Sequence, residues 1–353
     1  MHALKRFGTA FGGYKMMENY PVPECGPDDI ILEIKAAAIC GADMKHWGVD
    51  NGYDDTNITP DQQQSVRGHE FAGEIVKVGE NVKDWHIGQR VVSDNSAHVC
   101  GVCPACEQGD FLCCEHKVNL GLDNNTWGGG FSKYCKVPGE ILAIHKHAIW
   151  EIPEGIKYEE ACVLDPICNA YKAVAQQSHL IPGQDVVVFG TGPLGLFSVQ
   201  VAKLMGAVNI VMVGLDDDVK VRFGVAKELG ATHCVNGSKE DVVARCTEIC
   251  GRDNLGLVIE CSGANIALKQ AIEMTRPNAE IVRVGMGFKP LEFSINDITA
   301  WNKSIIGHMA YDSTSWRNCI RLLQSGQIKV QPMITHRLGL SQWQEGFDKM
   351  AKK

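Results

Sequence analysis

Long apolar runs are missing from this 353-residue chain, and nowhere do eighteen apolar residues follow one another. A membrane-spanning helix needs about 20 such residues, so we expect none. Lys5 and Arg6 are not followed by the apolar segment of a signal peptide. The fifteen cysteines are odd in number, and most lie singly in apolar segments, which is typical of reduced thiols. These features predict a cytoplasmic protein.

An excess of basic residues is also absent. Lys and Arg total 34 against 42 Asp and Glu, which gives a net charge of −8. Nucleic acid and anionic membrane are therefore not expected as partners. Internal repeats and low-complexity segments are missing as well, so the length suits two ordinary globular domains.

The two parts of the chain differ in their pattern of apolar residues and predicted secondary structure. Up to about residue 150, short alternating runs such as Ile30–Lys35 and Glu74–Val78 predict antiparallel strands. From about residue 170, strands alternate with helices, which predicts βαβ units and a parallel sheet. The elements expected there are strands at Asp185–Phe189, Asn209–Val213, His233–Val235, Leu257–Ile259 and Glu280–Val284, and helices at Leu194–Met205 and Val219–Leu229.

Four cysteines stand at C-x2-C-x2-C-x7-C spacing, with Cys113 as a spare beside the last. They are Cys100, Cys103, Cys106 and Cys114. Four thiolates at short spacing satisfy a tetrahedral zinc ion and leave no position for water, so we predict a structural zinc lobe at about residues 95–116. The alternatives are a disulfide pair or loose surface thiols.

A glycine-rich turn, G-x-G-x-x-G, directly follows a predicted apolar strand and opens a predicted helix. It is formed by Gly190, Thr191, Gly192, Pro193, Leu194 and Gly195. In this context the glycines permit a tight turn, close approach of the backbone to a pyrophosphate, and close packing of helix on strand. We therefore predict that this turn binds a dinucleotide; the alternative is a plain strand–helix turn.

Three acids, Asp216, Asp217 and Asp218, follow the second strand of this region. Carboxylates would repel a 2′-phosphate, and no Arg or Lys stands directly at the strand end, which favours NAD over NADP. We expect Asp216 to bind the ribose hydroxyls. The same acids also suit the N-terminus of a helix, where they cap it.

Two further strings complete the set of motifs. Gly68-His69-Glu70 opens G-H-E-x2-G-x5-G-x2-V, and Cys40-Gly41-Ala42-Asp43 lies upstream. With the four-cysteine run, the glycine-rich turn and the tail Pro332–Arg337, they resemble the zinc-dependent medium-chain dehydrogenases over nearly the whole chain. The resemblance is to the sorbitol (polyol) dehydrogenase type, with some features of threonine dehydrogenases.

The resemblance implies a fold and an assembly. Residues 1–169 and 304–353 would form a GroES-like, β-rich catalytic domain, and residues 170–303 a doubly wound Rossmann domain. The active site would lie where these domains meet, and the protein would be a homodimer or homotetramer.

The resemblance also implies a catalytic zinc. Cys40 and His69 fall on its ligands, Glu70 on a carboxylate that binds the metal directly or through its water, and Asp165 on an acid near the metal. An acid at that position points to polyol or threonine substrates rather than simple alcohols. Zinc would lower the pKa of the bound alcohol for hydride transfer to the nicotinamide.

Two positions depart from the family pattern. Ala42 replaces a Ser or Thr whose hydroxyl passes the substrate proton outward, and Lys45 replaces a frequent histidine, with His46 following. We hypothesise that a water at the metal, with Glu70 and His46, moves the proton instead.

The expected activity is reversible oxidation of a polyol to the ketose with NAD. Lys45, His46, Trp47, Tyr53 and Trp127 are candidates for the lining of a polar substrate pocket, and their alternative role is ordinary packing. The sequence has no obvious basic cluster that would bind the phosphate of a phosphorylated substrate, which favours a neutral polyol. The other candidate activities are oxidation of L-threonine at its 3-hydroxyl and a non-catalytic role as a zinc- and dinucleotide-binding redox sensor or scaffold.

Overall fold

A computed structural model describes residues 1–7, 13–45, 47, 65–123, 127–287 and 289–352. The chain divides into two compact units. Unit 1 comprises Met1–Asp165 and Ile334–Lys353, and unit 2 comprises Pro166–Met333. No helix within the described residues is long and apolar enough to cross a membrane.

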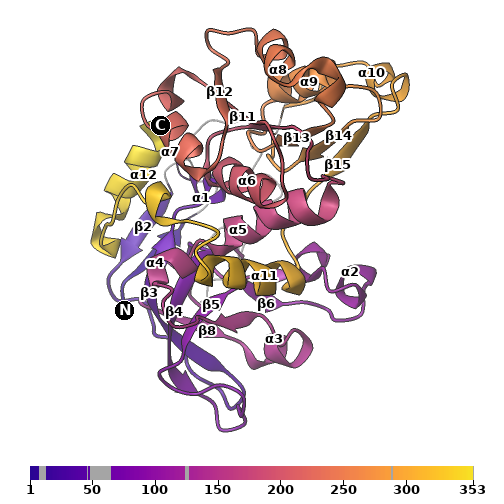
Figure 1. Ribbon diagram of the computed structural model, residues 1–353. Coiled ribbons are helices and arrows are strands. Elements are labelled where there is room, and N and C mark those ends of the chain that lie inside the picture. The colour runs from indigo at the N-terminus through magenta and orange to yellow at the C-terminus, as the bar shows by residue number, and fades with distance from the viewer. Residues whose placement is uncertain (8–12, 46, 48–64, 124–126, 288, 353) are drawn as a thin grey trace. The chain divides into compact units, whose positions relative to one another are not determined.

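Unit 1 is built on a five-stranded antiparallel sheet in the order β8-β3-β4-β5-β9 (Figure 1). The strands are β3 (Ile30–Ala38), β4 (Glu70–Val78), β5 (Arg90–Ser93), β8 (Tyr134–Val137) and β9 (Ile149–Glu151). Alternate side chains of a strand point to one face, so Ile30 and Leu32 of β3 and Phe71 of β4 are fully buried in one apolar core. Strand β4 begins at Glu70, four residues before the predicted start.

Shorter elements complete unit 1. They are β1 (Ala3–Arg6), β2 (Tyr14–Met17), α1 (Gly41–Lys45), β6 (Ser96–His98), α2 (Pro104–Glu107), η3 (Phe111–Cys113), β7 (Val118–Asn119), α3 (Gly139–Ile144), α4 (Tyr158–Ala161), η8 (Leu340–Gln342) and α12 (Trp343–Lys352). Helix α12 returns to this unit from the end of the chain. Its Phe347 is buried, and its ring packs edge-on against Tyr14 and Phe131.

Unit 2 contains a six-stranded, fully parallel sheet in the order β12-β11-β10-β13-β14-β15. The strands are β10 (Val186–Phe189), β11 (Ile210–Gly214), β12 (His233–Asn236), β13 (Leu257–Glu260), β14 (Glu280–Arg283) and β15 (Ser304–Gly307). Numbered from β10, this is the order 3-2-1-4-5-6 of the doubly wound dinucleotide-binding fold. The predicted fold class, a GroES-like β-rich part with a Rossmann part, is confirmed.

The remaining elements of unit 2 are mostly helices, several of which cover the sheet. They are α5 (Leu164–Tyr171, which begins in unit 1), the π-helical η4 (Lys172–Gln177), α6 (Pro193–Leu204), η5 (Asp216–Asp218), α7 (Arg222–Leu229), α8 (Val242–Cys250), η6 (Arg252–Asn254), α9 (Asn265–Met274), α10 (Asn296–Thr299), α11 (Ser313–Gln324) and η7 (Gln331–Met333). Helices α8 and α9 lie side by side (Figure 1), and their buried residues share an apolar core with the strands. The strands themselves are nearly all apolar because both faces of the sheet are covered.

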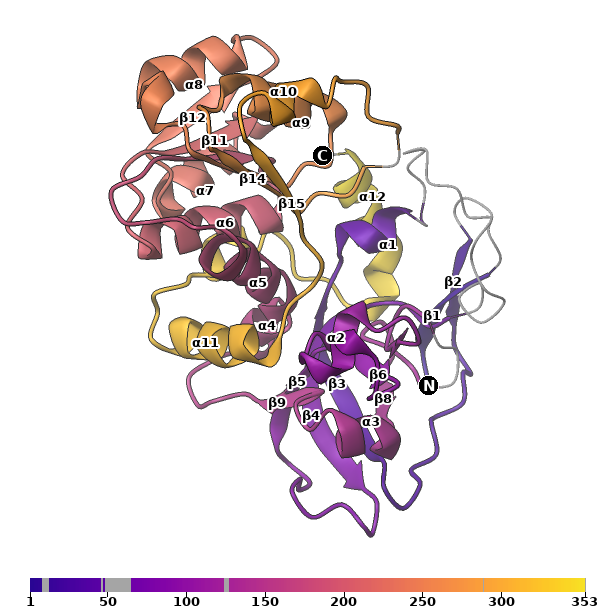
Figure 2. The same cartoon turned by 90° about the vertical axis from the view of Figure 1, so that its right-hand side faces the viewer.

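The division of the chain differs from the predicted boundaries at residues 169/170 and 303/304. Residues 304–333 belong to unit 2 rather than to the β-rich unit. The reason is that β15 pairs in parallel with β14 and forms the sixth strand of the sheet (Figure 2). Only residues from Ile334 onward return to unit 1.

Gly195 should be essential for the packing of α6 on the sheet. A Cβ atom at this position would lie 1.8 Å from the carbonyl oxygen of Gly190, whereas one at Gly224 in α7 would meet nothing within 4 Å. We expect Gly195→Ala to destabilise unit 2 by roughly 2 kcal/mol, and Gly224→Ala to leave it unchanged or stabilise it by up to about 1 kcal/mol. Thermal denaturation of both variants tests this, and equal Tm values would contradict the packing argument.

Candidate active site and dinucleotide loop

Cys40, His69 and Glu70 lie together in unit 1 because β3 pairs with β4. Ala38, the last residue of β3, is opposite Glu70, the first residue of β4. Cys40 follows β3 by two residues, and His69 directly precedes β4. One ligand atom from each of the three side chains lies within 4.8 Å of the others. The expected cluster therefore forms at one end of a single strand pair.

Asp43 in α1 contacts two members of this cluster, Cys40 and His69. It is fully buried, and its Oδ2 accepts a hydrogen bond from the Cys40 backbone N–H at 3.0 Å. Its Oδ1 lies 3.8 Å from both His69 Nδ1 and Arg67 Nη2, and these three atoms have no hydrogen-bond partner within the described part of the chain. Because Nδ1 of His69 faces the Asp43 carboxylate, the other ring nitrogen, Nε2, is the one available to bind a metal. The sequence analysis did not single out Asp43.

The electrostatics of the cluster favour a cation. Burial raises the pKa of Glu70 well above its usual range, and the negative charge of Asp165 raises it further. Burial also raises the pKa of the Cys40 thiol, and the charges of Glu70 and Asp43 add to that effect. Anionic donors crowded together away from water are unfavourable without a counter-charge. One thiolate, one imidazole and one carboxylate are donors that Zn²⁺ accepts, so the residues fit a catalytic zinc.

Asp165 is not a member of the close group of three donors. It lies in the first turn of α5, is half-buried, and acts on Cys40 and Glu70 through its charge. Its Oδ2 accepts a hydrogen bond from Asn95 Nδ2 at 3.1 Å. Asn95 has a left-handed backbone (φ 61°), which Asn adopts more readily than most residues. Sequence analysis missed Asn95, and its only local signal was an Asp-Asn-Ser turn.

The other candidates near the site have mixed outcomes. His46 and Tyr53 lie outside the described residues, as does the side chain of Lys45. The ring of Trp47 packs edge-on against Trp343 and Phe347. Trp127 packs against the core of the antiparallel sheet. Both tryptophans therefore make packing contacts.

The four cysteines Cys100, Cys103, Cys106 and Cys114 also come together. Their sulfur atoms lie within 4.8 Å of one another, on a loop closed by the pairing of β6 with β7. Cys114 Sγ is 3.6 Å from Cys100 Sγ, far longer than a disulfide bond, and none of the fifteen cysteines, every one of them described, forms a disulfide. Exposed Cys113 is not in the group. The donor set fits a structural zinc.

Two thiols of this group have shifted pKa values. The backbone N–H of Val102 is the main cause that lowers the pKa of Cys100 to about 6. Desolvation raises the pKa of Cys106 to about 12. A bound cation would favour the thiolate form of both groups, because a coordinating thiol is deprotonated.

The glycine-rich turn connects β10 to α6 as predicted. Gly190 has φ +95°, and a Cβ atom there would lie 3.0 Å from the Ser262 backbone nitrogen. Gly192 is the N-cap of α6, Pro193 begins the helix, and Leu194 and Gly195 follow. A Cβ atom at Gly192 would meet nothing within 4 Å. This free space beside the unpaired N–H groups of a 12-residue helix fits a pyrophosphate.

The acids after β11 differ in their surroundings. Asp216 is exposed; Asn236 Nδ2 donates to its Oδ1 at 2.7 Å, and this bond is the main cause that lowers its pKa. Asp218 is half-buried, and its Oδ2 lies 2.9 Å from the position of a Cβ on Gly214, the last residue of β11. Arg222 Nη1 lies 3.4 Å from Asp218 Oδ1 and 3.5 Å from Thr191 Oγ1. A basic residue that sequence analysis did not single out thus approaches the turn.

A β-rich unit with a Cys-His-Glu cluster and a four-cysteine lobe, together with a doubly wound dinucleotide unit, defines a zinc-dependent dehydrogenase. Comparison with known families gives the same class. Residues 26–147 match the alcohol dehydrogenase GroES-like domain, and residues 193–325 match the zinc-binding dehydrogenase family. The chain belongs to the zinc-type medium-chain alcohol dehydrogenases, and it is an oxidoreductase whose cofactors are zinc and a nicotinamide dinucleotide.

Three related proteins match over nearly their whole length. YdjL of Escherichia coli K12, named an uncharacterized zinc-type alcohol dehydrogenase-like protein, is 78% identical over 100% of this chain and 96% of its own. A sorbitol dehydrogenase of Halalkalibacterium halodurans is 29% identical over 98% and 95%. An L-threonine 3-dehydrogenase of Rhizobium rhizogenes is 32% identical over 95% and 91%.

Solved structures share the fold as well. The 2R,3R-butanediol dehydrogenase of Bacillus subtilis aligns with a TM-score of 0.84 and 29% identity, over 100% of this chain and 96% of its own. The alcohol dehydrogenase rspB of E. coli CFT073, solved with NADH, aligns with a TM-score of 0.85 and 27% identity, over 100% and 96%.

Asp43 should be important for the stability of unit 1. In Asp43→Asn the amide oxygen can still accept the Cys40 N–H, but buried Arg67 loses its counter-charge, so we expect a loss of roughly 3 kcal/mol. Denaturant unfolding of chelator-treated protein measures it. Lys35→Gln, which removes the exposed ion pair with Glu33, is the control and should change little. A stability equal to that of wild type would show that Asp43 does not compensate Arg67.

Proposed function

We propose that this dehydrogenase reversibly oxidises a secondary hydroxyl of a neutral polyol to the ketone, with NAD as the hydride acceptor. The observation that carries the proposal is the cluster of half-buried Cys40 with buried His69 and Glu70, and the Asp165 carboxylate beside it. A second acid near the cluster offers an acceptor for a neighbouring substrate hydroxyl, which a simple alcohol does not have. Sorbitol and 2,3-butanediol, named in two relatives, both carry adjacent hydroxyls.

Each residue has a distinct role in this proposal. Cys40, His69 and Glu70 would hold the catalytic zinc, and Asp43 would orient His69 and Cys40. Zinc held there would supply a Lewis acid that lowers the pKa of the substrate hydroxyl, and a bound nicotinamide would supply the hydride acceptor. Cys100, Cys103, Cys106 and Cys114 would hold a second zinc that is structural.

The substrate proton needs another route because Ala42 has no hydroxyl. Burial and the charge of Asp165 raise the pKa of the Glu70 carboxyl, which makes its carboxylate a better proton acceptor than an exposed one. We propose that Glu70 accepts this proton, with His46 as a further relay. Asp165, held by Asn95, would orient the substrate.

Threonine oxidation is the second candidate. It is favoured by the relatives named L-threonine 3-dehydrogenase and by the Asp165–Ala170 segment, which resembles theirs. A non-catalytic role as a redox sensor or scaffold would be the third, and it would require only the structural zinc.

A substrate panel with NAD tests the proposal. We expect NADH formation with one or more tetritols, pentitols or hexitols, none with L-threonine, and two zinc ions per chain. Glu70→Gln should lower kcat by about 10²-fold or more, whereas Cys113→Ser should retain activity and both metals. Turnover of threonine without polyol would favour the second candidate. One zinc per chain without turnover would favour the scaffold.

We propose that Asp218, rather than the expected Asp216, makes the protein prefer NAD to NADP. The Asp218 carboxylate lies at the end of β11 beside Gly214, and Gly214 in turn neighbours Thr191 of the glycine-rich turn. Asp216 is instead engaged by Asn236 and Lys239. We propose that Asp218 binds the ribose hydroxyls and that it neutralises Arg222, which alone would attract a 2′-phosphate.

The ratio of kcat/KM for NAD to that for NADP tests this role. Asp218→Asn should lower the ratio by about tenfold or more, because a charge-assisted hydrogen bond to the ribose is lost and Arg222 is released. Asp217→Asn makes the same substitution next to it and should leave the ratio unchanged. If Asp216→Asn lowered the ratio instead, the original assignment would stand.

We further propose a cytoplasmic homo-oligomer. The location is supported by fifteen cysteines that form no disulfide, four of them in a metal-binding pattern. Self-association is supported by β15, an edge strand of the described sheet, and by exposed Leu291, Ile295 and Trp301 close to it in sequence.

A further inference from the structure

Glu260 is a fully buried carboxylate that the proposed reaction does not use. It is the last residue of β13 and pairs in register with Phe189, the last residue of β10. The order of the strands reverses between β10 and β13, so Glu260 lies at the switch point of the sheet. In doubly wound folds the ligand binds outside the carboxyl ends of the strands at this point.

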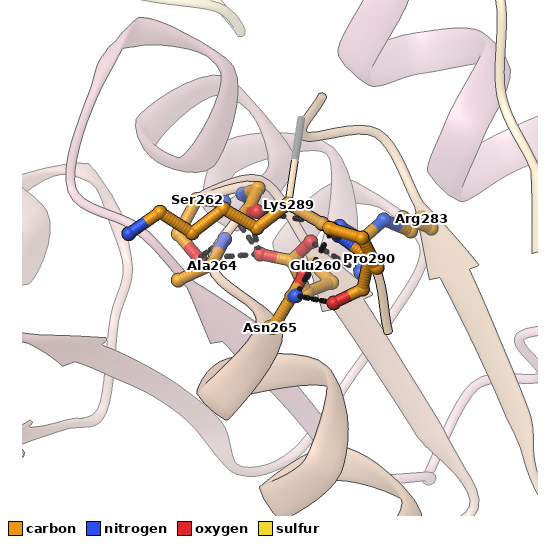
Figure 3. A network of polar contacts seen from close by, with 8 residues as sticks. Glu260, Ser262, Ala264, Asn265, Arg283, Lys289 and Pro290 are labelled. Atoms are coloured by element: carbon orange, nitrogen blue, oxygen red, sulfur yellow. Dashed lines mark hydrogen bonds and ion pairs between the residues drawn. The ribbon is translucent and has the colours of Figure 1, made fainter. Parts of the chain in front are cut away.

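The carboxylate holds the loop that follows its own strand. Its Oε1 accepts three hydrogen bonds: from the Ser262 N–H at 2.7 Å, the Ser262 hydroxyl at 2.5 Å and the Gly263 N–H at 2.9 Å (Figure 3). Three donors on one oxygen restrain the loop more strongly than a neutral turn would, because hydrogen bonds to a charged group are about twice as strong as neutral ones.

Arg283 holds the same loop from the neighbouring strand. It is the last residue of β14 and stands in register with Glu260. Its Nη2 donates to the Gly263 carbonyl at 3.3 Å, and its Nη1 lies 3.9 Å from Glu260 Oε2 (Figure 3). Glu260 Oε2 and Arg283 Nη1 are buried, and neither has a hydrogen-bond partner in the described part of the chain. The two opposite charges therefore face each other away from water and share Gly263.

The loop is in backbone contact with its neighbours on both sides. The Cys261 N–H donates to the Phe189 carbonyl, directly before Gly190 of the dinucleotide turn. On the other side, Cβ atoms at Gly285 and Gly287 would each lie 2.1 Å from a backbone atom of Gly263. A displacement of the Gly263 backbone would therefore also displace the neighbouring segments that it contacts.

We propose that Glu260 and Arg283 form a positioning pair that sets loops 261–264 and 285–287 for the nicotinamide half of the cofactor. The pyrophosphate is expected on α6 and the adenosine ribose at the end of β11, so the other half extends over β13 and β14. The pair acts through the loops without touching the cofactor. This inference rests on the proposed use of NAD.

Binding of cofactor fragments to the zinc-loaded enzyme tests the pair. Glu260→Gln keeps the shape and one acceptor oxygen but removes the charge. We expect it to weaken NADH about tenfold, since hydrogen bonds to a charged group are replaced by neutral ones. Its affinity for ADP-ribose, which lacks the nicotinamide, should stay at the wild-type value. Glu280→Gln, at the opposite end of β14, is the matched control and should change neither affinity.

Two further variants separate positioning from a general structural role. Ser262→Ala removes one of the three donors to Glu260 but leaves both charged side chains in place, and should weaken NADH binding about threefold with the affinity for ADP-ribose unchanged. In a double-mutant cycle, Glu260→Gln combined with Arg283→Met should be no weaker for NADH than the worse single variant, as expected for groups that act together.

The outcomes are distinguishable from those of the proposed function. If the wild-type enzyme bound neither NADH nor ADP-ribose, the proposed use of NAD would be refuted. The positioning role of Glu260 and Arg283, which rests on it, would then be refuted as well. Wild-type binding with unchanged NADH affinity in Glu260→Gln and Ser262→Ala would overturn the positioning role alone. Equal weakening of NADH and ADP-ribose would also overturn it, because the loop would then be only structural.

Discussion

The antiparallel pairing of β3 with β4 is the interaction on which the candidate metal centre depends. The strand register places the end of β3 opposite the start of β4. The three donors lie at or within two residues of these two strand ends. Cys40 and His69 are far apart in sequence, so no local propensity brings them together. A slip by one residue would turn alternate side chains to the other face and disperse the donors.

The centre also depends on charges that are buried behind it. Asp43 faces Arg67 and His69, and Asp165 raises the pKa of Glu70. Such crowding of carboxylates costs stability in the metal-free protein and favours a divalent cation. The same principle operates in unit 2, where buried Glu260 at the switch point faces half-buried Arg283 of the neighbouring strand, and both bind the loop at Gly263. Both units therefore place buried charge at the ends of strands, beside their candidate ligands.

Much of the fold could be predicted from periodicity and glycine placement. Local sequence patterns predict the strand–turn–helix at Gly190, the strands that follow it and the cysteine group. The structure contains all of them. β15 was missed because a four-residue strand, Ser304–Gly307, has no distinctive pattern, and only its pairing with β14 defines it. The predicted domain boundary at residue 304 differs for the same reason.

At the candidate site, the sequence by itself determined the donor types: the four-cysteine run is recognisable from its spacing, and Cys40, His69 and Glu70 from the resemblance of their motifs to the dehydrogenase family. Only the tertiary structure decided the groups around them. Asn95 and Asp165 are 70 residues apart, and at the dinucleotide turn of unit 2 the Asp218 carboxylate lies beside Gly214. The physical reason is that a ligand's chemistry belongs to one side chain, whereas burial, counter-charge and hydrogen-bond partners come from segments that meet only when the chain folds.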